Sequence, residues 1–284
     1  MRILFIGAHQ DDNEFNGGGL AYKYVKMGHE VAFLSLCNGC GGHHILTPEE
    51  TSRTRAAESA KVAKTLGIRY DIWSDVDDCS IEPTLENRRR LIRYIRAFCP
   101  DLIISHRPND YHADHRATGQ LVMDASYLLI VPHECPDVPA MRRMPVIMSY
   151  ADSFRNPPVR GDVVIDITDE VDMKLKIADI NVSQVYEWLP YTEEEDVPED
   201  AAERFEWLKG MDITEETTDE ELMAAPRGYL VRYAKVAARF RRELIAAYGE
   251  ERGSRIRFAE AYEVSEYGRQ LDADVKKTLF PFLP

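Results

Sequence analysis

The sequence has no long apolar run and little cysteine. No uninterrupted apolar segment reaches the length of about 20 residues that a membrane-spanning helix needs, and the apolar start, MRILFIGAH, is too short for the core of a signal peptide. The five cysteines are odd in number and irregularly spaced, so they predict no disulfide framework. We therefore expect a protein of the cytoplasm, which is a reducing compartment, and no contact with a membrane.

Positive charge is also in short supply. The chain has 35 lysines and arginines against 49 aspartates and glutamates, which gives a net charge of −14. Binding to nucleic acid needs basic surface to neutralise phosphates, so this balance argues against it and favours a small-molecule partner. The length of 284 residues and the hydrophobic fraction of 44% are typical of a globular protein that can bury a large core.

The first half of the chain alternates apolar strand patterns with amphipathic helix patterns. We expect buried strands at 2–8, 30–37, 68–74 and 100–106, and helices at 18–28, 47–67, 84–98 and 114–129. This alternation predicts βαβ units with right-handed crossovers. The expected fold is therefore α/β, a Rossmann-like and mostly parallel sheet with helices on both faces.

The second half of the chain is less regular. Further strands are expected at 145–150, 162–168 and 255–264, and long helices at 169–189 and 225–249. A strongly acidic stretch lies between these two helices, and we interpret it as a solvated helical insertion rather than an acidic partner-binding tail. With no repeats and no low-complexity linker, we expect residues 1–284 to form a single domain that contains a helical insertion at about 187–252.

Two dense polar clusters come directly after expected strands. GAHQDDNE follows the first strand, and SHRPNDYHADH follows the fourth. In open α/β sheets, ligands bind outside the carboxyl ends of the strands, so both clusters are expected at one edge of the sheet. Charged groups at a strand end cost desolvation energy unless something pairs with them, and a metal ion is the natural candidate.

The spacing within the clusters suits a hydrolytic metal site. Such a site takes three ligands from His, Asp or Glu and keeps one position open. His9 and Asp12 lie three residues apart in the first loop, as do His112 and His115 in the second, so a His, Asp, His set can be drawn from both loops. Adjacent residues of an extended loop point different ways, so Asp11 and Asp12 are not expected to hold the same ion.

At these residues the sequence resembles the LmbE-like, PIG-L type N-deacetylases. AHQDDNE followed by GGG is similar to the AHPDDxE motif of that family, and DYHADH to its later HPDH. The helix that carries Arg55 and Glu58 resembles the family's Arg-x-x-Glu helix, and KLKIADINVSQ its Lys…Ser-Gln segment. The resemblance covers residues 1 to about 185 and is regained at RFAEAY. Gln10 and Asn181 depart from it, where the family has proline and histidine.

The resemblance implies a role for each matching residue. It implies one zinc ion per chain, or another divalent transition metal, held by His9, Asp12 and His115. It implies Asp11 as the general base, and His112 as the protonated group that stabilises the oxyanion and serves the leaving amine, with Asp114 orienting it. Substrate contacts are expected from Arg55, Asp78 (or its neighbour Asp77) and Tyr111. The family also implies a homo-oligomer.

The function expected from these residues is zinc-dependent removal of an acetyl group from an N-acetylated amino sugar or a GlcNAc-type conjugate. The alternative is a non-catalytic carbohydrate-binding relative, although such a protein has no need of a proton-transfer pair. A nucleotide-dependent oxidoreductase is disfavoured because the G-x-G-x-x-G fingerprint is missing after the first strand. The lone CxxC at Cys37 and Cys40 is a weak redox or metal signal, since no second pair accompanies it.

Overall fold

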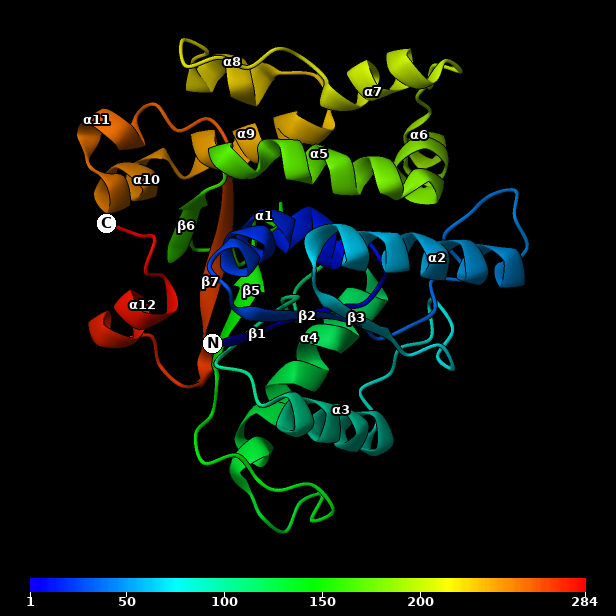
Figure 1. The fold of residues 1–284 in the computed structure, drawn as a ribbon, viewed down its shortest axis with the longest axis vertical. Coiled ribbons are helices and arrows are strands. Elements are labelled where there is room, and N and C mark those ends of the chain that lie inside the picture. Colours follow the sequence, from blue (N-terminus) through cyan, green and yellow to red (C-terminus); the bar gives the residue numbers. More distant parts are fainter.

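The computed structural model describes residues 1–284 and is built around a seven-stranded sheet (Figure 1). The strands are β1 (Arg2–Gly7), β2 (Glu30–Ser35), β3 (Arg69–Ile72), β4 (Leu102–Ser105), β5 (Val146–Tyr150), β6 (Val163–Asp166) and β7 (Ala259–Gly268). Their order is β3-β2-β1-β4-β5-β7-β6. The first five strands pair in parallel, and β7 runs antiparallel to both β5 and β6. The predicted mostly parallel α/β fold is confirmed.

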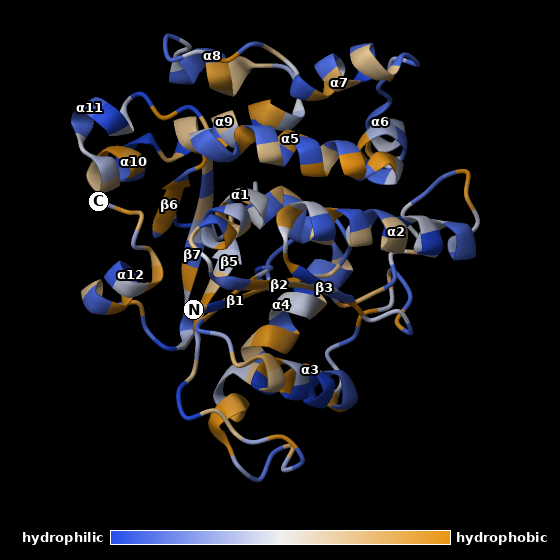
Figure 2. Ribbon diagram, in the orientation of Figure 1, coloured by the Kyte–Doolittle hydropathy of each residue, from blue (hydrophilic) through white to orange (hydrophobic).

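Helices cover both faces of the sheet, with α1, α2 and α5 on one side and α3 and α4 on the other (Figure 1). The helices are α1 (Asp12–Lys26), α2 (Pro48–Leu66), α3 (Leu85–Phe98), α4 (Ala113–Ser126), α5 (Val171–Ile180), α6 (Leu189–Glu193), α7 (Ala201–Lys209), α8 (Asp219–Ala224), α9 (Tyr229–Arg239), α10 (Arg241–Tyr248), α11 (Glu250–Gly253) and α12 (Ala273–Leu279). Figure 2 shows hydrophobic central strands between helices of mixed character, so one apolar core lies on each face of the sheet.

Local sequence signals explain where the best-predicted helix, α2, begins and ends. Thr47 and Glu50 form a reciprocal capping box at its start, which satisfies two backbone N–H groups that have no partner within the helix. Gly67 ends it in the left-handed conformation, with φ of 75°, which glycine adopts without a Cβ clash. These bounds agree with the helix predicted at 47–67.

Other helices differ from their prediction because tertiary packing overrides local pattern. The helix expected at 225–249 is divided into α9 and α10 at Phe240, whose backbone leaves the helical region and whose ring is buried in a small third core. The helix expected at 169–189 ends at Ile180, and a turn of π-helix, Ser183–Trp188, continues in its place. π-Helical turns often occur at functional sites.

Helix α1 begins at Asp12, earlier than predicted, and so contains the run of three glycines. Those glycines allow close packing. A Cβ atom built on Gly17 would lie 2.4 Å from the Phe5 ring of β1, and one built on Gly18 would lie 2.7 Å from Ile177 of α5. The helix therefore lies closer to the sheet and to α5 than any side chain at these positions would permit.

Changing Gly17 to alanine should destabilise the protein, although alanine normally stabilises a helix by about 0.5–1 kcal/mol relative to glycine. The added methyl group would overlap the buried Phe5 ring, and overpacking of this kind costs about 1–3 kcal/mol. Urea unfolding followed by circular dichroism would show a lower midpoint with an unchanged slope. A midpoint higher than that of the wild type would contradict this account of the glycine run.

The acidic stretch in the second half of the chain contains the helices α6, α7 and α8, and α9 to α11 follow it. Helix α9 packs on α1 side chains and on β7, and α10 packs on β6, so this segment extends the side of the sheet that carries α5 (Figure 1). The description of residues 1–284 as one domain with an insertion at about 187–252 stays a prediction. None of the helices has the length and apolar character needed to span a bilayer.

Candidate active site and metal centre

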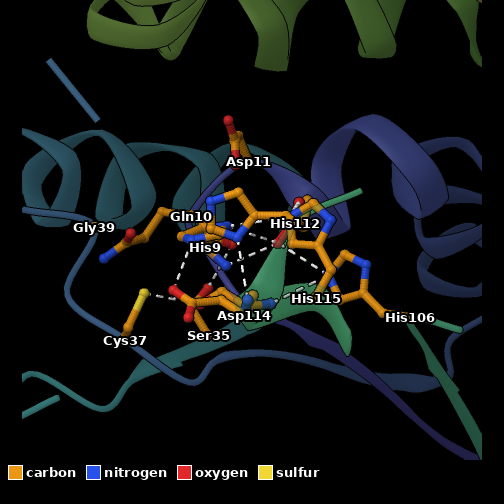
Figure 3. Close-up of polar contacts among 12 residues, drawn as sticks. His9, Gln10, Asp11, Ser35, Cys37, Gly39, His106, His112, Asp114 and His115 are labelled. Carbon is orange, nitrogen blue, oxygen red and sulfur yellow. Dashed lines mark hydrogen bonds and ion pairs between the residues drawn. The ribbon is translucent and has the colours of Figure 1, made fainter. Parts of the chain in front are cut away.

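The two polar clusters meet at the carboxyl ends of β1 and β4, which are neighbouring strands. The first loop ends at Asp11, the N-cap of α1, and the second ends at His112, the N-cap of α4. The topology therefore brings together side chains that are about a hundred residues apart in the sequence (Figure 3).

The ligand atoms of His9, Asp12 and His115 lie close together, and we call these three side chains the metal triangle. The His115 Nε2 atom lies 3.3 Å from His9 Nδ1 and 3.3 Å from Asp12 Oδ1, and His9 Nδ1 lies 3.5 Å from the other Asp12 oxygen, Oδ2. Ligands held tetrahedrally at about 2.0–2.1 Å from a zinc ion are separated by about 3.3 Å, so these spacings suit a metal site. The three side chains are buried.

The outer nitrogens of the two histidines face carboxylates. His115 Nδ1 lies 2.9 Å from Asp110 Oδ1, while His9 Nε2 lies 3.0 Å from Asp78 Oδ1 and 3.3 Å from Asp114 Oδ2. Metal-binding histidines almost always donate their second N–H to such a partner, which fixes the tautomer and the ring orientation. Burial alone would lower the pKa of His115, but Asp12 and Asp110 outweigh it and raise that pKa to about 9. An ion must therefore displace a proton to bind.

His106 belongs to this cluster, although no role was predicted for it. Its Nε2 atom lies 3.0 Å from Asp12 Oδ2, and its ring stacks on His115 with centroids 4.0 Å apart. Asp12, His106 and His115 also have ligand atoms close enough to share an ion. The sequence feature that could have identified His106 is its position, because it directly follows strand β4. Asp110 was missed as well, although it lies within the same polar motif.

The Asp11 side chain makes none of the polar contacts that join His9, Asp114 and His115 (Figure 3). Its Oδ1 atom lies 3.3 Å from an Arg55 guanidinium nitrogen, and its backbone φ of 135° is unusual for a residue other than glycine. Burial raises the pKa of Asp11 to about 6, and the positive charge of Arg55 opposes a larger rise. A carboxylate that titrates near neutral pH is suited to accept a proton.

Arg55 is not placed as the resemblance implies. It was expected to contact a sugar, but the side chain is only 2% exposed. Its guanidinium lies beside Asp11 and donates hydrogen bonds to the carbonyl oxygens of Gln10 and Gly39. Arg55 therefore supports the loop that carries Asp11 from the protein side, through the carbonyl oxygens of Gln10 and Gly39.

His112 is half-buried at the start of α4, with its ring centroid 4.7 Å from that of His9. Its Nδ1 atom accepts the backbone N–H of Asp114 at 3.2 Å, and its second ring nitrogen has no hydrogen-bond partner within the chain. Burial and the neighbouring His9 and His115 lower the pKa of His112. The surroundings therefore do not favour the protonated state that the resemblance implies for the resting protein.

The Asp114 side chain does not orient His112, contrary to expectation. Its carboxylate accepts the backbone N–H of Cys79 at 2.7 Å and that of Ile81 at 3.2 Å, and it approaches His9. The reason is geometric: the first turn of α4 presents the backbone of Asp114 to His112, and the side chain faces the loop after β3. This carboxylate supports the metal triangle and the wall of the site.

The two remaining expected substrate contacts differ in exposure. Asp78 is directed at His9 from the loop after β3. Tyr111 is 73% exposed, and its ring lies edge-on to His112 and His115 with centroids 5.8 and 5.3 Å away. Of these two, only Tyr111 presents an open surface at the mouth of the site.

A network of hydrogen bonds holds the loop after β2 against this site. Glu58 accepts both the N–H and the hydroxyl of Ser183, which fixes the π-helical turn to α2. The neighbouring Gln184 donates from Nε2 to the Gly42 carbonyl at 3.0 Å. The Arg-x-x-Glu and Ser-Gln segments noted in the sequence are therefore structural parts of one wall.

A match to a protein-family model shows what the first part of the chain is related to. The model described as GlcNAc-PI de-N-acetylase (PIG-L) matches residues 4–126, which contain the whole metal triangle. Residues 4–126 therefore form a PIG-L, LmbE-like domain. The chain is 26% identical over 201 residues to the diacetylchitobiose deacetylase of Thermococcus kodakarensis, a match that covers 67% of this chain and 74% of the relative.

Solved structures show the same fold. The N,N′-diacetylchitobiose deacetylase of Pyrococcus horikoshii superposes with a TM-score of 0.64 at 21% identity, over 93% of this chain and 83% of that one. The 4-carboxy-2-hydroxymuconate hydratase of Pseudomonas putida superposes with a TM-score of 0.69 at 17% identity, over 95% and 98% of the two chains. Because the same fold occurs in a deacetylase and in a hydratase, the chemistry of this chain has to be argued from its site.

Proposed function

We propose that this protein is a metal-dependent hydrolase that removes the acetyl group from an N-acetylated amino sugar or a GlcNAc-type conjugate. The observation that carries the proposal is the triangle of His9, Asp12 and His115 with the near-neutral carboxyl of Asp11 beside it. The PIG-L domain at residues 4–126 and the similarity to a diacetylchitobiose deacetylase support the choice of an N-acetyl substrate.

His9, Asp12 and His115 would hold one ion per chain, zinc or another divalent transition metal. Two nitrogens and one carboxylate oxygen form a donor set typical of catalytic zinc, which keeps a fourth position open. Such an ion supplies Lewis-acid polarisation of the amide carbonyl and lowers the pKa of water at its open position. Asp110, Asp78 and Asp114 act as positioning residues, because each fixes the outer nitrogen of a ligand histidine.

Asp11 accepts a proton from the attacking water while the oxygen of that water adds to the carbon of the amide carbonyl. A pKa of about 6 leaves this carboxylate mostly ionised at neutral pH, yet basic enough to take a proton in the transition state. Without Arg55 the pKa of Asp11 would be higher and the carboxyl would be protonated at neutral pH, since the positive charge of Arg55 favours the carboxylate.

His112 then acts on the tetrahedral intermediate. Because Nδ1 accepts the Asp114 N–H, the ring proton lies on the other nitrogen, where it would stabilise the oxyanion and the leaving nitrogen by hydrogen bonding. The C–N bond breaks only when the nitrogen of the amino sugar is protonated. Asp11 would return to it the proton taken from water, and the products are acetate and the amine. Tyr111 offers its exposed ring to the sugar.

Acetate release tests the proposal. Protein reconstituted with zinc should release acetate from N,N′-diacetylchitobiose or N-acetylglucosamine, lose this activity on chelation, and regain it when zinc is restored. Sugar binding without acetate release would favour the alternative, a non-catalytic carbohydrate-binding relative. A cytoplasmic location and a homo-oligomer stay predictions, and light scattering on the purified protein would test the second.

A further inference from the structure

We propose that Asp78, Cys79 and His112 form a second metal site, next to the triangle of His9, Asp12 and His115, at which excess zinc inhibits the enzyme. Metal binding at this site is independent of the proposed deacetylase function, whereas the inhibition rests on it. The inference starts from Cys79, an exposed cysteine at the mouth of the site that the mechanism does not use.

The three side chains converge from two segments. Asp78 and Cys79 belong to the loop between β3 and α3, and His112 caps α4. One ligand atom from each residue lies within 4.8 Å of the other two, and Cys79 Sγ is 3.5 Å from Asp78 Oδ1. A bound ion would need to draw these atoms together by about 1 Å, since zinc ligands at 2.0–2.3 Å lie about 3.3–3.8 Å apart.

Main-chain contacts hold the loop at Cys79, so the position of this residue does not depend on which side chain it carries. Cys79 has a left-handed φ of 62°, and its N–H donates to the Asp114 carboxylate at 2.7 Å, so the loop is held by main-chain contacts. The orientation of the His112 ring is also fixed by the main chain. Its Nδ1 atom accepts the Asp114 N–H, which leaves the other ring nitrogen without a hydrogen bond inside the chain.

The donor set selects the kind of ion. A thiolate, an imidazole and a carboxylate suit zinc, and the soft sulfur favours cadmium as a probe over hard ions such as magnesium. The thiol releases its proton to solvent as the metal–sulfur bond forms. Asp78 connects the two sites, because its Oδ1 atom also lies 3.0 Å from His9 Nε2.

Occupation of this site would stop turnover through His112. A ring nitrogen bound to an ion carries no proton for the oxyanion or for the leaving nitrogen. Zinc should therefore activate the protein when the triangle fills and inhibit it at higher concentration. Replacing Cys79 with serine removes the sulfur ligand, while the main-chain contacts and the proposed catalytic residues stay in place.

Cadmium titration of the metal-free protein tests binding without reference to activity. We expect two cadmium ions per chain and an ultraviolet thiolate-to-cadmium band in the wild type, but one ion and no band in Cys79→Ser. The matched control is Cys40→Ser, a partly buried cysteine at the same edge of the sheet that lies outside the cluster, and it should behave as the wild type. A band that survives in Cys79→Ser would overturn the proposal and would point to buried Cys37 near His9.

Zinc inhibition tests the consequence. In Cys79→Ser the inhibitory zinc concentration should rise at least about tenfold, equivalent to about 1.4 kcal/mol of lost binding, while activity with one zinc ion per chain stays unchanged. Equal inhibition of both proteins would overturn the inhibitory role. If the wild type releases no acetate at all, the proposed function fails, and the cadmium titration still decides whether the site exists.

Discussion

Replacing Asp11 with asparagine should lower kcat for acetate release by about 10²–10⁴-fold, the usual contribution of a general base. Asparagine has nearly the same shape but cannot accept a proton from water. Asp11 is not one of the proposed metal ligands, and its charged contact is with Arg55. We therefore expect the zinc content and the circular dichroism spectrum of the variant to match those of the wild type.

The matched control is Asp124→Asn, the same change on α4 at a residue that accepts a hydrogen bond from Gln120. It should keep full activity. The wild type should also lose kcat/KM as the pH falls through about 6, because protonation of Asp11 removes the base. Full turnover by the Asp11→Asn protein would disprove the assignment, whatever the pH profile.

Replacing Lys174 with methionine should lower the free energy of unfolding by about 3–5 kcal/mol, the typical cost of removing one partner of a buried ion pair. Lys174 is fully buried, and its Nζ atom lies 2.9 Å from Glu260 Oε1. It also donates to the carbonyl oxygens of Glu14 and Phe15 in α1. Methionine would leave the Glu260 carboxylate and both carbonyls without this partner.

The pair also bears on the site, because Glu260 accepts the N–H groups of Gly19 and Leu20 on the helix that follows the metal-binding loop. The control is Lys26→Met. Lys26 is partly exposed, and its partner Glu170 keeps a second lysine, Lys23, so we expect a loss below about 1 kcal/mol. Urea unfolding of the two variants gives the comparison, and equal losses would contradict the role assigned to Lys174.

Local sequence was sufficient where a segment carries its own signals. The helix at 47–67 was predicted to its ends because Thr47 and Gly67 determine them by capping and by left-handed backbone. The division of 225–249 at Phe240 was not predicted, since the helical pattern runs through that residue. What breaks the helix is the burial of the Phe240 ring in a core formed by distant segments.

Within the site, residue types and spacing pointed to His9, Asp12 and His115, but not to their supports. The roles of Asp110 and Asp78 beside the histidines follow from distances that no spacing encodes. Arg55 was assigned to a sugar from a motif, yet whether an arginine faces ligand or protein depends on what surrounds it.

The sequence by itself determined the alternation of strands and helices, because hydrophobic periodicity and capping signals are local properties. In a parallel sheet that alternation also indicates which loops share an edge. Only the tertiary structure decided which nitrogen of each histidine faces the triangle, that the Asp114 carboxylate supports His9 rather than His112, and that Lys174 reaches Glu260. These features depend on side-chain direction and burial, which arise when distant segments pack together.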